Sequence, residues 1–428
     1  MSARLAVFVA FALRLALGLA LRPPPTWDGA LYHRAAQGLV RGLGYSCFMF
    51  GPQADPSVAT AYYPVGLPAY LAAFYRVLGE GDLARSVAGA VAGAAGAALA
   101  AVIARPMLGA RAPLAAWIVA LSPGAALYAA APMTETLWGA LLAAVVALLL
   151  DAEAPSRRRV LLIGATLAAA AFVRPQALVL LPVLPGMAGG AWRVRLARTL
   201  GVALTVAVLV APWSLRNCAT LDGCALISTN GAGNFAIGAV PRADGRYLAL
   251  TGDDGCRGVR GEIARERCWR RVTRAEITRA PGRWPGLAPA KIWHTWGYEA
   301  FPAGYLRAAR PDVLSARDED RLREALTAAW GVLLALALVS LLPTHPRPPL
   351  GRAGRMALAV LALVTLTHAL FFGGDRYHLA LLPLVAPLAL RAFVYTPPWR
   401  RRRWAWVGSS AADPGAALEL QGPTPPRG

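Results

Sequence analysis

Long apolar runs alternate with short polar or basic loops along most of the chain. Several of the runs are shorter than the roughly 20 residues that a bilayer-spanning helix prefers. Ala, Gly and Pro are frequent within them, which suits close helix packing in lipid. The pattern predicts an all-α polytopic membrane protein with about ten transmembrane helices, at residues 3–21, 83–104, 112–130, 135–151, 158–173, 177–191, 197–212, 325–342, 355–372 and 377–395.

The first run could be mistaken for a secretory signal peptide. It contains Arg14, however, and it ends in RPPP without a small-residue cleavage site. We therefore expect residues 3–21 to be retained as the first transmembrane helix.

Residues 62–79, YYPVGLPAYLAAFYRVLG, form an additional apolar stretch that either crosses the membrane as an eleventh span or lies on its surface. With ten spans and a cytoplasmic N-terminus, the short cytoplasmic loops hold 11 Arg and the short opposite loops hold 2. An eleventh span at 62–79 would invert this distribution, against the preference of basic residues for the cytoplasmic side. We predict that 62–79 is an interfacial helix on the outer leaflet, a depth that aromatic side chains favour.

This topology divides the chain into four parts. Residues 1–212 form a seven-span module that includes a first outer loop at 22–82, and residues 213–323 form a large extracytoplasmic loop domain. Three more spans fill 324–396. The tail 397–428 begins with basic residues and is rich in Pro and Gly, which predicts a disordered cytoplasmic segment.

Composition agrees with a multi-pass protein of the cell inner (plasma) membrane. Hydrophobic residues make up 57% of the chain, and the formal net charge is +21. Arg supplies nearly all of the positive charge, and it lies mostly in loops between apolar runs, where it sets membrane orientation. A nucleic-acid partner is therefore not expected. The chain also lacks a Walker loop and the GxSxG and GxGxxG motifs in a suitable context.

All five cysteines fall in the predicted outer segments, which favours disulfides because that compartment is oxidising. Two local bridges, Cys218–Cys224 and Cys256–Cys268, would leave Cys47 over. Three pairings of the four cysteines are open, and the sequence does not choose among them.

Two carboxylates lie near the predicted outer face. Asp28 follows the first span and precedes a helical pattern at 29–41, so it is a candidate helix N-cap as well as a candidate reactive group. Glu135 opens the fourth span, where the positive helix N-terminus favours an acid. Ionisable groups beside membrane spans are also functional candidates, and one acid of a pair can act as base while the other positions substrate.

Three arginines lie near the same face: Arg174 after span five, Arg216 after span seven and Arg376 before span ten. Such side chains often extend to the lipid headgroups. They could equally bind a phosphate, because guanidinium groups match phosphate oxygens. His33 and His378 also lie near this face, but no histidine pair has metal-ligand spacing, and we assign no residue as a metal ligand.

The order of these motifs resembles the polytopic lipid-phosphate-sugar-dependent glycosyltransferases of the C fold class. The resemblance is nearest to glycosyltransferase family 39, with its protein O-mannosyltransferases, and to the aminoarabinose transferases of lipid A. It covers most of 5–395 and rests on an ordered set of segments: WDGALYHRAAQGLVRGLGY, YYPVGLPAYLAAFYRVLG, PMTETLWGALL, FVRPQALVLLP, APWSLRN, STNGAGNFAIG and DRYHLALLPLVAPL.

The resemblance implies an inverting transfer of a hexose or pentose from a polyprenyl-phosphate donor to a hydroxyl of a glycan, lipid or protein acceptor. Asp28 would be the general base and Glu135 the second acidic position. The donor phosphate would bind Arg376, with Arg174 and Arg216. Tyr32, His33, Asn230, Asn234 and Tyr377 are candidates for substrate binding, although the two asparagines are more simply turn residues.

The sequence departs from these relatives at two places. Many of them carry an acid directly after the first Asp, where this chain has Gly29, and a Lys-Pro-Pro start of the interfacial helix is replaced by Tyr63–Pro64. A phosphate contact or metal ligand of some relatives is therefore in doubt. We assign no certain cofactor and leave a divalent metal open.

The main alternative is a secondary transporter or a flippase of lipid-linked glycans. Transporters often contain internal repeats with midplane binding sites. This chain shows seven spans followed by three, no evident repeat, and candidate charges near one surface, which favours an enzyme. A glycan polymerase or ligase and a non-catalytic assembly protein are further alternatives.

Overall fold

The computed structural model describes residues 2–150, 156–187, 190–342 and 350–394. These residues form helices joined by loops, and within them the only β-type pairings are two isolated bridges, Ser46 with Ala59 and Arg246 with Gly373. The all-α prediction is confirmed. The basic tail predicted at 397–428 lies outside the described residues.

Every predicted span corresponds to a helix or to a pair of consecutive helices. Five helices are long and apolar enough to cross a membrane: α1, α4, α10, α16 and α17. The remaining spans are shorter or are divided near a proline, as at Pro123 between α5 and α6 and at Pro383 between η5 and α18, because proline lacks the backbone N–H that a continuous helix needs. The bundle contains α1 (Ala3–Leu21), α4 (Asp82–Leu108), η2 (Gly109–Arg111), α5 (Pro113–Leu121), α6 (Pro123–Tyr128), α7 (Thr134–Leu150), α8 (Arg157–Val173), η3 (Pro175–Val183), α9 (Leu184–Met187), α10 (Trp192–Thr220), α16 (Ala316–Leu341), α17 (Gly351–Leu370), η5 (His378–Leu381) and α18 (Leu382–Arg391).

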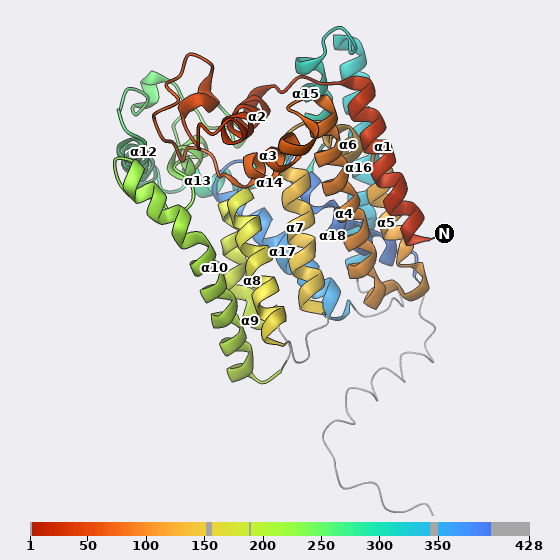
Figure 1. Ribbon diagram of the computed structural model, residues 1–428. Helices are drawn as coiled ribbons and strands as arrows, with labels where there is room; N and C mark the ends of the chain where they lie inside the picture. Colours follow the sequence, from red (N-terminus) through yellow and green to blue (C-terminus); the bar gives the residue numbers. More distant parts are fainter. Residues whose placement is uncertain (1, 151–155, 188–189, 343–349, 395–428) are drawn as a thin grey trace, which may run out of the picture.

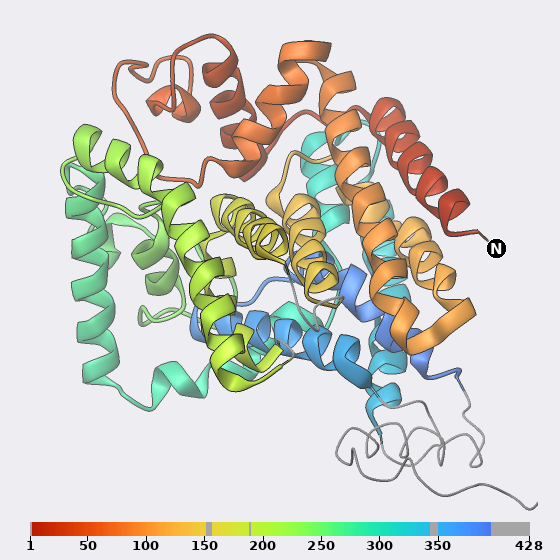
Figure 2. The same ribbon diagram turned by 60° about the horizontal axis from the view of Figure 1, so that its bottom comes forward.

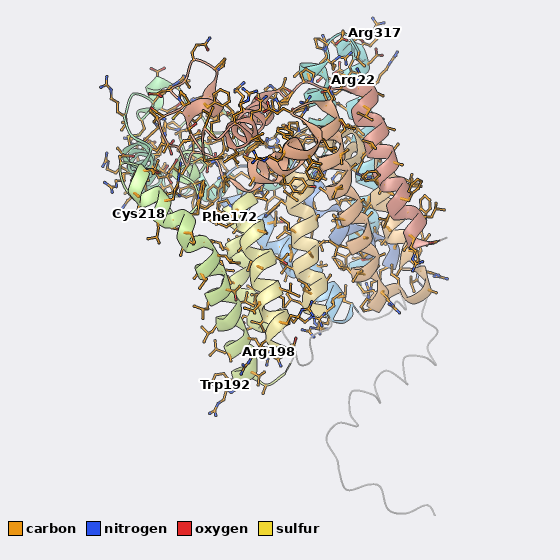
Figure 3. All side chains as sticks on the ribbon, in the orientation of Figure 1. Arg22, Phe172, Trp192, Arg198, Cys218 and Arg317 are labelled. Carbon is orange, nitrogen blue, oxygen red and sulfur yellow. A yellow bond between two sulfur atoms is a disulfide. The ribbon has the colours of Figure 1, made fainter. Side chains whose placement is uncertain are left out.

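The remaining helices gather at one end of the bundle, called here the loop end (Figure 1). Phe172, at the end of α8, lies at the boundary between the bundle and the loop end, whereas Trp192 and Arg198 lie at the opposite end (Figure 3). The predicted outer segments 22–82 and 213–323 therefore meet on one side of the bundle. Their helices are α2 (Trp27–Val40), η1 (Cys47–Phe50), α3 (Gly66–Leu78), α11 (Gly231–Ile237), η4 (Gly252–Asp254), α12 (Glu262–Arg279), α13 (Arg283–Gly286), α14 (Ala288–Trp296) and α15 (Phe301–Ala309).

The apolar stretch 62–79 does not form an eleventh span. Its helix α3 has 13 residues and lies at the loop end, where it packs against α2 and α4. The short length of α3 agrees with the prediction, drawn from the short-loop arginine distribution, that 62–79 is not a span.

The loop end carries the disulfides. Cys218 is bonded to Cys224 and Cys256 to Cys268, while Cys47 is not disulfide-bonded. The two local bridges are confirmed among the three pairings that the sequence left open.

Small residues allow the helices to approach closely. Buried alanines of α4, including Ala97 and Ala100, are fully inaccessible in the main core. A Cβ atom at Gly139 of α7 would lie 2.2 Å from the carbonyl oxygen of Ala380 in η5. Glycine at this position therefore lets η5 pack directly on the helix that carries Glu135.

Arg14 is buried in the middle of α1, with 1% of its surface exposed. Its guanidinium donates hydrogen bonds to the carbonyl oxygens of Val119 (2.7 Å) and Ala120 (3.1 Å), where α5 ends before Pro123. Gly93 of α4 makes room, because a Cβ atom there would lie 2.3 Å from the Arg14 side chain. Arg14 thus satisfies helix-end carbonyls that have no water to bind in a bilayer.

We expect Arg14→Met to lower the free energy of unfolding by about 2–4 kcal/mol, because it leaves these buried carbonyls without their charged donor. Thermal unfolding of the detergent-purified protein measures the change. Phe8→Leu is the matched control, since Phe8 lies on the same helix and is exposed. Equal stability of the two variants would show that the carbonyls of Val119 and Ala120 find other partners.

Candidate functional site

Asp28 lies in the first turn of α2 at the loop end. Thr26 is the N-cap residue of this helix, so the expectation that Asp28 is the N-cap was wrong. The helix begins earlier because the backbone N–H of Ala30 already donates to the carbonyl oxygen of Thr26 at 3.2 Å, although Trp27, its first residue, has a φ of 50°. Asp28 therefore projects from inside the helix, and 29% of its side-chain surface is exposed.

Both carboxylate oxygens of Asp28 have a donor. The hydroxyl of Tyr63 donates to Oδ1 at 2.8 Å, and Nη1 of Arg376 donates to Oδ2 at 3.0 Å. Burial and the nearby Asp28 raise the pKa of Tyr63 well above its usual value. The tyrosine therefore keeps its proton and serves as a hydrogen-bond donor to the carboxylate.

Arg376 also connects Asp28 to Glu135. Its Nε lies 3.5 Å from Oε1 of Glu135, and the same oxygen pairs with Nη2 of Arg174. Glu135 is fully buried, while Arg376 and Arg174 keep only 17% and 12% of their side-chain surfaces exposed. The four side chains form a continuous series, Asp28–Arg376–Glu135–Arg174, called here the acid–arginine chain.

The other oxygen of Glu135 is also bound. Tyr128 donates its hydroxyl to Oε2 at 3.0 Å, and Thr134 lies 3.3 Å from it. Nε of Arg174 in turn donates to the hydroxyl oxygen of Thr134 at 2.7 Å. A buried carboxylate is expensive to leave unpaired, and this one is fully satisfied by its neighbours.

Aromatic rings lie against the two arginines. The guanidinium of Arg174 is 5.0 Å from the ring centre of Tyr377 and 5.5 Å from that of Trp138. Arg376 is 5.3 Å from the ring centre of Tyr377 and 5.1 Å from that of Phe301. Cation–π contacts of this kind hold the guanidinium groups in place within a poorly hydrated site.

The segment that carries Arg376 is anchored on both sides. The Oδ2 atom of Asp375 accepts hydrogen bonds from the backbone N–H groups of Ala300 (2.6 Å) and Phe301 (2.5 Å) at the start of α15. The ring of His378 lies 2.7 Å from the carbonyl oxygen of Thr295 and 3.0 Å from Oε2 of Glu299. These anchors leave the intervening Arg376 little freedom to move.

Sequence reasoning missed several of these partners. Asp375, Glu299 and Tyr128 were not candidates, and Tyr63 was noted only as an interfacial aromatic residue and a departure from the relatives. Glu299 and His378 are 79 positions apart in the chain, so no local motif connects them. Only the packing of the turn between α14 and α15 against the start of η5 brings them together.

Arg216 makes a different set of contacts from Arg174 and Arg376. Its Nη2 and Nη1 donate to the carbonyl oxygens of Tyr45 (2.5 Å) and Thr60 (2.7 Å), and its guanidinium lies over the ring of Trp213. These contacts hold the first outer loop against α10. We do not include Arg216 in the proposed donor site.

Among the substrate-binding candidates, Tyr377 lies directly against the acid–arginine chain. Tyr32 is buried with its ring edge against Tyr63, at a centre-to-centre distance of 5.0 Å. His33 shares a 2.7 Å hydrogen bond with the hydroxyl of Tyr75 instead. The side chain of Asn230 accepts a hydrogen bond from Ser228, and Asn234 lies in α11; no described contact connects either asparagine to Asp28.

Within the described residues, no three His, Cys, Asp or Glu side chains gather in a way that could hold a metal ion.

Comparison with known proteins gives structural matches only. No protein-family model and no curated protein matches the sequence. The apo oligosaccharyltransferase of Archaeoglobus fulgidus aligns over 98% of this chain and 52% of its own, with 11% identity and a TM-score of 0.51. This chain has the glycosyltransferase C fold.

Other solved structures align less closely in space. ArnT from Cupriavidus metallidurans bound to undecaprenyl phosphate aligns over 91% of this chain and 77% of its own, with 18% identity and a TM-score of 0.40. The oligosaccharyltransferase AglB from Archaeoglobus fulgidus, with an inhibitory peptide and a dolichol-phosphate, aligns over 97% and 52%, with 13% identity and a TM-score of 0.49. The chain thus spans about half the length of the oligosaccharyltransferase and three quarters of ArnT.

We expect His33 to make the protein sensitive to acid. Burial, followed by the positive charge of Arg85, lowers the pKa of His33 to about 4, below its ordinary value of about 6.5. The unfolded chain therefore binds more protons between these values, and stability falls as the pH drops from about 6.5 to about 4.

His33→Gln should give a shallower fall of the thermal unfolding temperature over this pH window than the wild type shows. The other titrating groups are common to both proteins, so their contributions to the pH dependence cancel in this comparison. Parallel curves for the two proteins would mean that His33 does not titrate differently in the folded state.

Proposed function

We propose that this protein is an inverting glycosyltransferase that moves a hexose or pentose from a polyprenyl-phosphate donor to an acceptor hydroxyl. The observation that carries the proposal is the acid–arginine chain, which places a partly exposed carboxylate beside two largely buried cations at the loop end of a glycosyltransferase C fold. The reaction would take place at the outer face of the cell inner membrane, with a glycan, lipid or protein as acceptor.

The charges of the site favour a substrate that brings a phosphate. Two carboxylates and two guanidiniums balance each other, and both oxygens of Asp28 are occupied by donors. A phosphate near Arg376 would compete with Asp28 for the guanidinium, because phosphate and carboxylate offer it the same kind of acceptor. Donor binding would thus free one oxygen of Asp28 for the acceptor.

The acceptor oxygen attacks the anomeric carbon, and its proton passes to Oδ2 of Asp28, which acts as general base. The bond between the anomeric carbon and the phosphate oxygen breaks, and its electron pair leaves on the polyprenyl phosphate. Arg376 and Arg174 stabilise the negative charge that grows on this leaving group. Attack opposite the leaving group inverts the anomeric centre.

Glu135 has a positioning role in this proposal. Its carboxylate is fully buried and contacts both arginines, so it is poorly placed to take a proton from a water-borne acceptor. It holds the two guanidiniums close together in spite of their mutual repulsion. The two acids of the site therefore have different tasks because they differ in burial.

Asp28→Asn should reduce release of sugar from the donor by about 10²–10⁴-fold, the range expected for loss of a general base. The measurement uses purified protein, a panel of labelled polyprenyl-phosphate sugars and total envelope extract as acceptor source. Asp55→Asn is the matched control, since Asp55 is an exposed acid of the same outer loop.

Equal turnover by wild type and Asp28→Asn would show that Asp28 does not act as the general base. Movement of lipid or solute across liposomes without release of sugar from any donor would favour the transporter alternative instead.

Arg376→Gln should lower kcat by about 10²–10³-fold, since it removes a donor aimed at charge that develops in the transition state. Arg376→Lys should keep part of the activity, because the cation remains while the bridge between Asp28 and Glu135 is lost. Arg41→Gln serves as control. Arg41 is the C-cap residue of α2, the helix that carries Asp28, and its exposed side chain pairs with Glu80. Full activity of Arg376→Gln would show that the acid–arginine chain only joins the loop to the bundle.

A further inference from the structure

The short helix α15 contacts both of the segments that carry Asp28 and Arg376. The link between α1 and α2, drawn in red, passes beside the teal segment that contains α15 (Figure 2). The backbone N–H of Thr26, the N-cap residue of α2, donates to the hydroxyl oxygen of Tyr305 at 3.0 Å. Tyr305 is buried, with 3% of its surface exposed. A buried side chain of α15 therefore binds the chain two residues before Asp28.

The hydroxyl of Tyr305 also lies against Gly29, the residue that follows Asp28. A Cβ atom at Gly29 would lie 2.7 Å from this oxygen, which is closer than Cβ atoms approach in real structures, and 3.3 Å from the side chain of Pro132. Gly29 does not have a positive φ, so the contact with α15, and not the backbone conformation, accounts for the glycine. This is also the position at which many of the relatives carry an acid.

Aromatic rings extend the connection between α15 and the start of α2. The ring centre of Trp27 lies 5.3 Å from that of Phe301 and 5.6 Å from that of Tyr305, edge to face in both pairs. Trp27 has a φ of 50°, which is a strained conformation for a residue other than glycine. Such a conformation persists only where the surrounding contacts impose it. The packing of Trp27 on α15 supplies these contacts directly beside Asp28.

The first residue of α15 is attached to the segment of Arg376. The ring of Phe301 lies 5.1 Å from the guanidinium of Arg376, and its backbone N–H donates to Asp375 at 2.5 Å. One turn further along the same helix, Tyr305 holds the start of α2. The helix thus connects the two partners of the ion pair between Asp28 and Arg376 by a second route.

The ion pair by itself is a weak means of fixing the carboxylate. Asp28 is partly exposed, and ion pairs within reach of water contribute little because the solvent competes with them. A general base must lie within hydrogen-bond reach of the hydroxyl that it deprotonates. A misplacement of about 1 Å can cost about 10²-fold in rate. The buried contacts of α15 meet this requirement better than the ion pair does.

We propose that Tyr305 is a positioning residue for the sugar transfer. Through its hydroxyl and its ring, α15 holds the first turn of α2, and with it the carboxylate of Asp28, at a fixed place relative to Arg376. Tyr305 acts through Asp28 and does not touch the substrates. This inference rests on the proposed glycosyltransferase function and assigns a part in it to a residue of the large outer segment.

Gly29→Ala tests the contact from the side of α2. The new methyl group would displace the first turn of α2 from Tyr305, so kcat for sugar release should fall about 10²-fold. The KM for the donor should stay within about twofold, because the arginines of the proposed donor site are unchanged. Gly38→Ala is the matched control, since Gly38 lies in the same helix and a Cβ atom there would meet only ordinary contacts at 3.4 Å.

Tyr305→Phe tests the contact from the side of α15, because it removes the hydroxyl and keeps the ring. Alone it should lower kcat about tenfold, and combined with Gly29→Ala it should give a kcat about tenfold above that of Gly29→Ala, since the missing oxygen makes room for the methyl group. Tyr70→Phe is the control. It removes a hydrogen bond of the same length class, from Tyr70 to the carbonyl oxygen of Ala88 at 2.8 Å, and should leave kcat within about twofold of wild type.

Thermal unfolding of each variant in the same detergent separates a loss of stability from a loss of kcat. Normal kcat in Tyr305→Phe, or losses that simply multiply in the double variant, would overturn the proposal. A fall of kcat that only follows a lower unfolding temperature would do the same, because it would make Tyr305 a purely structural residue. If Gly29→Ala does not fold, the comparison of Tyr305→Phe with Tyr70→Phe decides.

Failure of the proposed function would look different. Absence of sugar release by the wild type would contradict the glycosyltransferase proposal itself. Normal release by the wild type together with unaffected variants would contradict only the role of Tyr305.

Discussion

The rest of the site depends on a carboxylate buried without access to water. Glu135 has no exposed side-chain surface, and a charge in that position must be paired or it destabilises the fold. Arg174, Arg376, Tyr128 and Thr134 supply its partners from three different parts of the chain. Because Arg376 also pairs with Asp28, the pairing of Glu135 fixes the surroundings of the partly exposed Asp28 as well.

This arrangement needs rigid support, and the structure provides it at both ends of the segment around Arg376. Asp375 binds the start of α15, and His378 lies between Thr295 and Glu299. Gly139 lets η5 pack against α7, so that the helix bearing Glu135 and the segment bearing Arg376 are in direct contact. The guanidinium groups are therefore placed before any substrate arrives, which is what electrostatic stabilisation of a transition state requires.

The loop end combines this rigid centre with a more exposed outer segment. Glu262 and Arg216 both bind the first outer loop near Thr60, one from α12 and the other from α10. Two disulfides close local loops within the same segment. The outer segment is thus tied to the loop that carries Tyr63, whose hydroxyl donates to Asp28.

The sequence by itself determined the all-α fold, a helix or helix pair at each predicted span, the short helix within 62–79 and the end of the bundle at which the acids and arginines gather. These features follow from local hydrophobicity and from the distribution of arginine, which act over single segments of the chain. It also singled out Asp28, Glu135, Arg174 and Arg376 as candidates, through the resemblance and through their positions at helix ends.

Only the tertiary structure decided which of these groups touch. Asp28 and Arg376 are 348 positions apart. The sequence places both Arg174 and Arg216 just after a predicted span, yet Arg216 lies inside α10 and binds loop carbonyls instead. The start of α2 also escaped prediction, because the first helical hydrogen bond runs from the N–H of Ala30 to the carbonyl oxygen of Thr26, which makes Thr26 the N-cap. Such contacts depend on how whole helices pack, and a pattern within one segment carries no information about the partner that another segment brings.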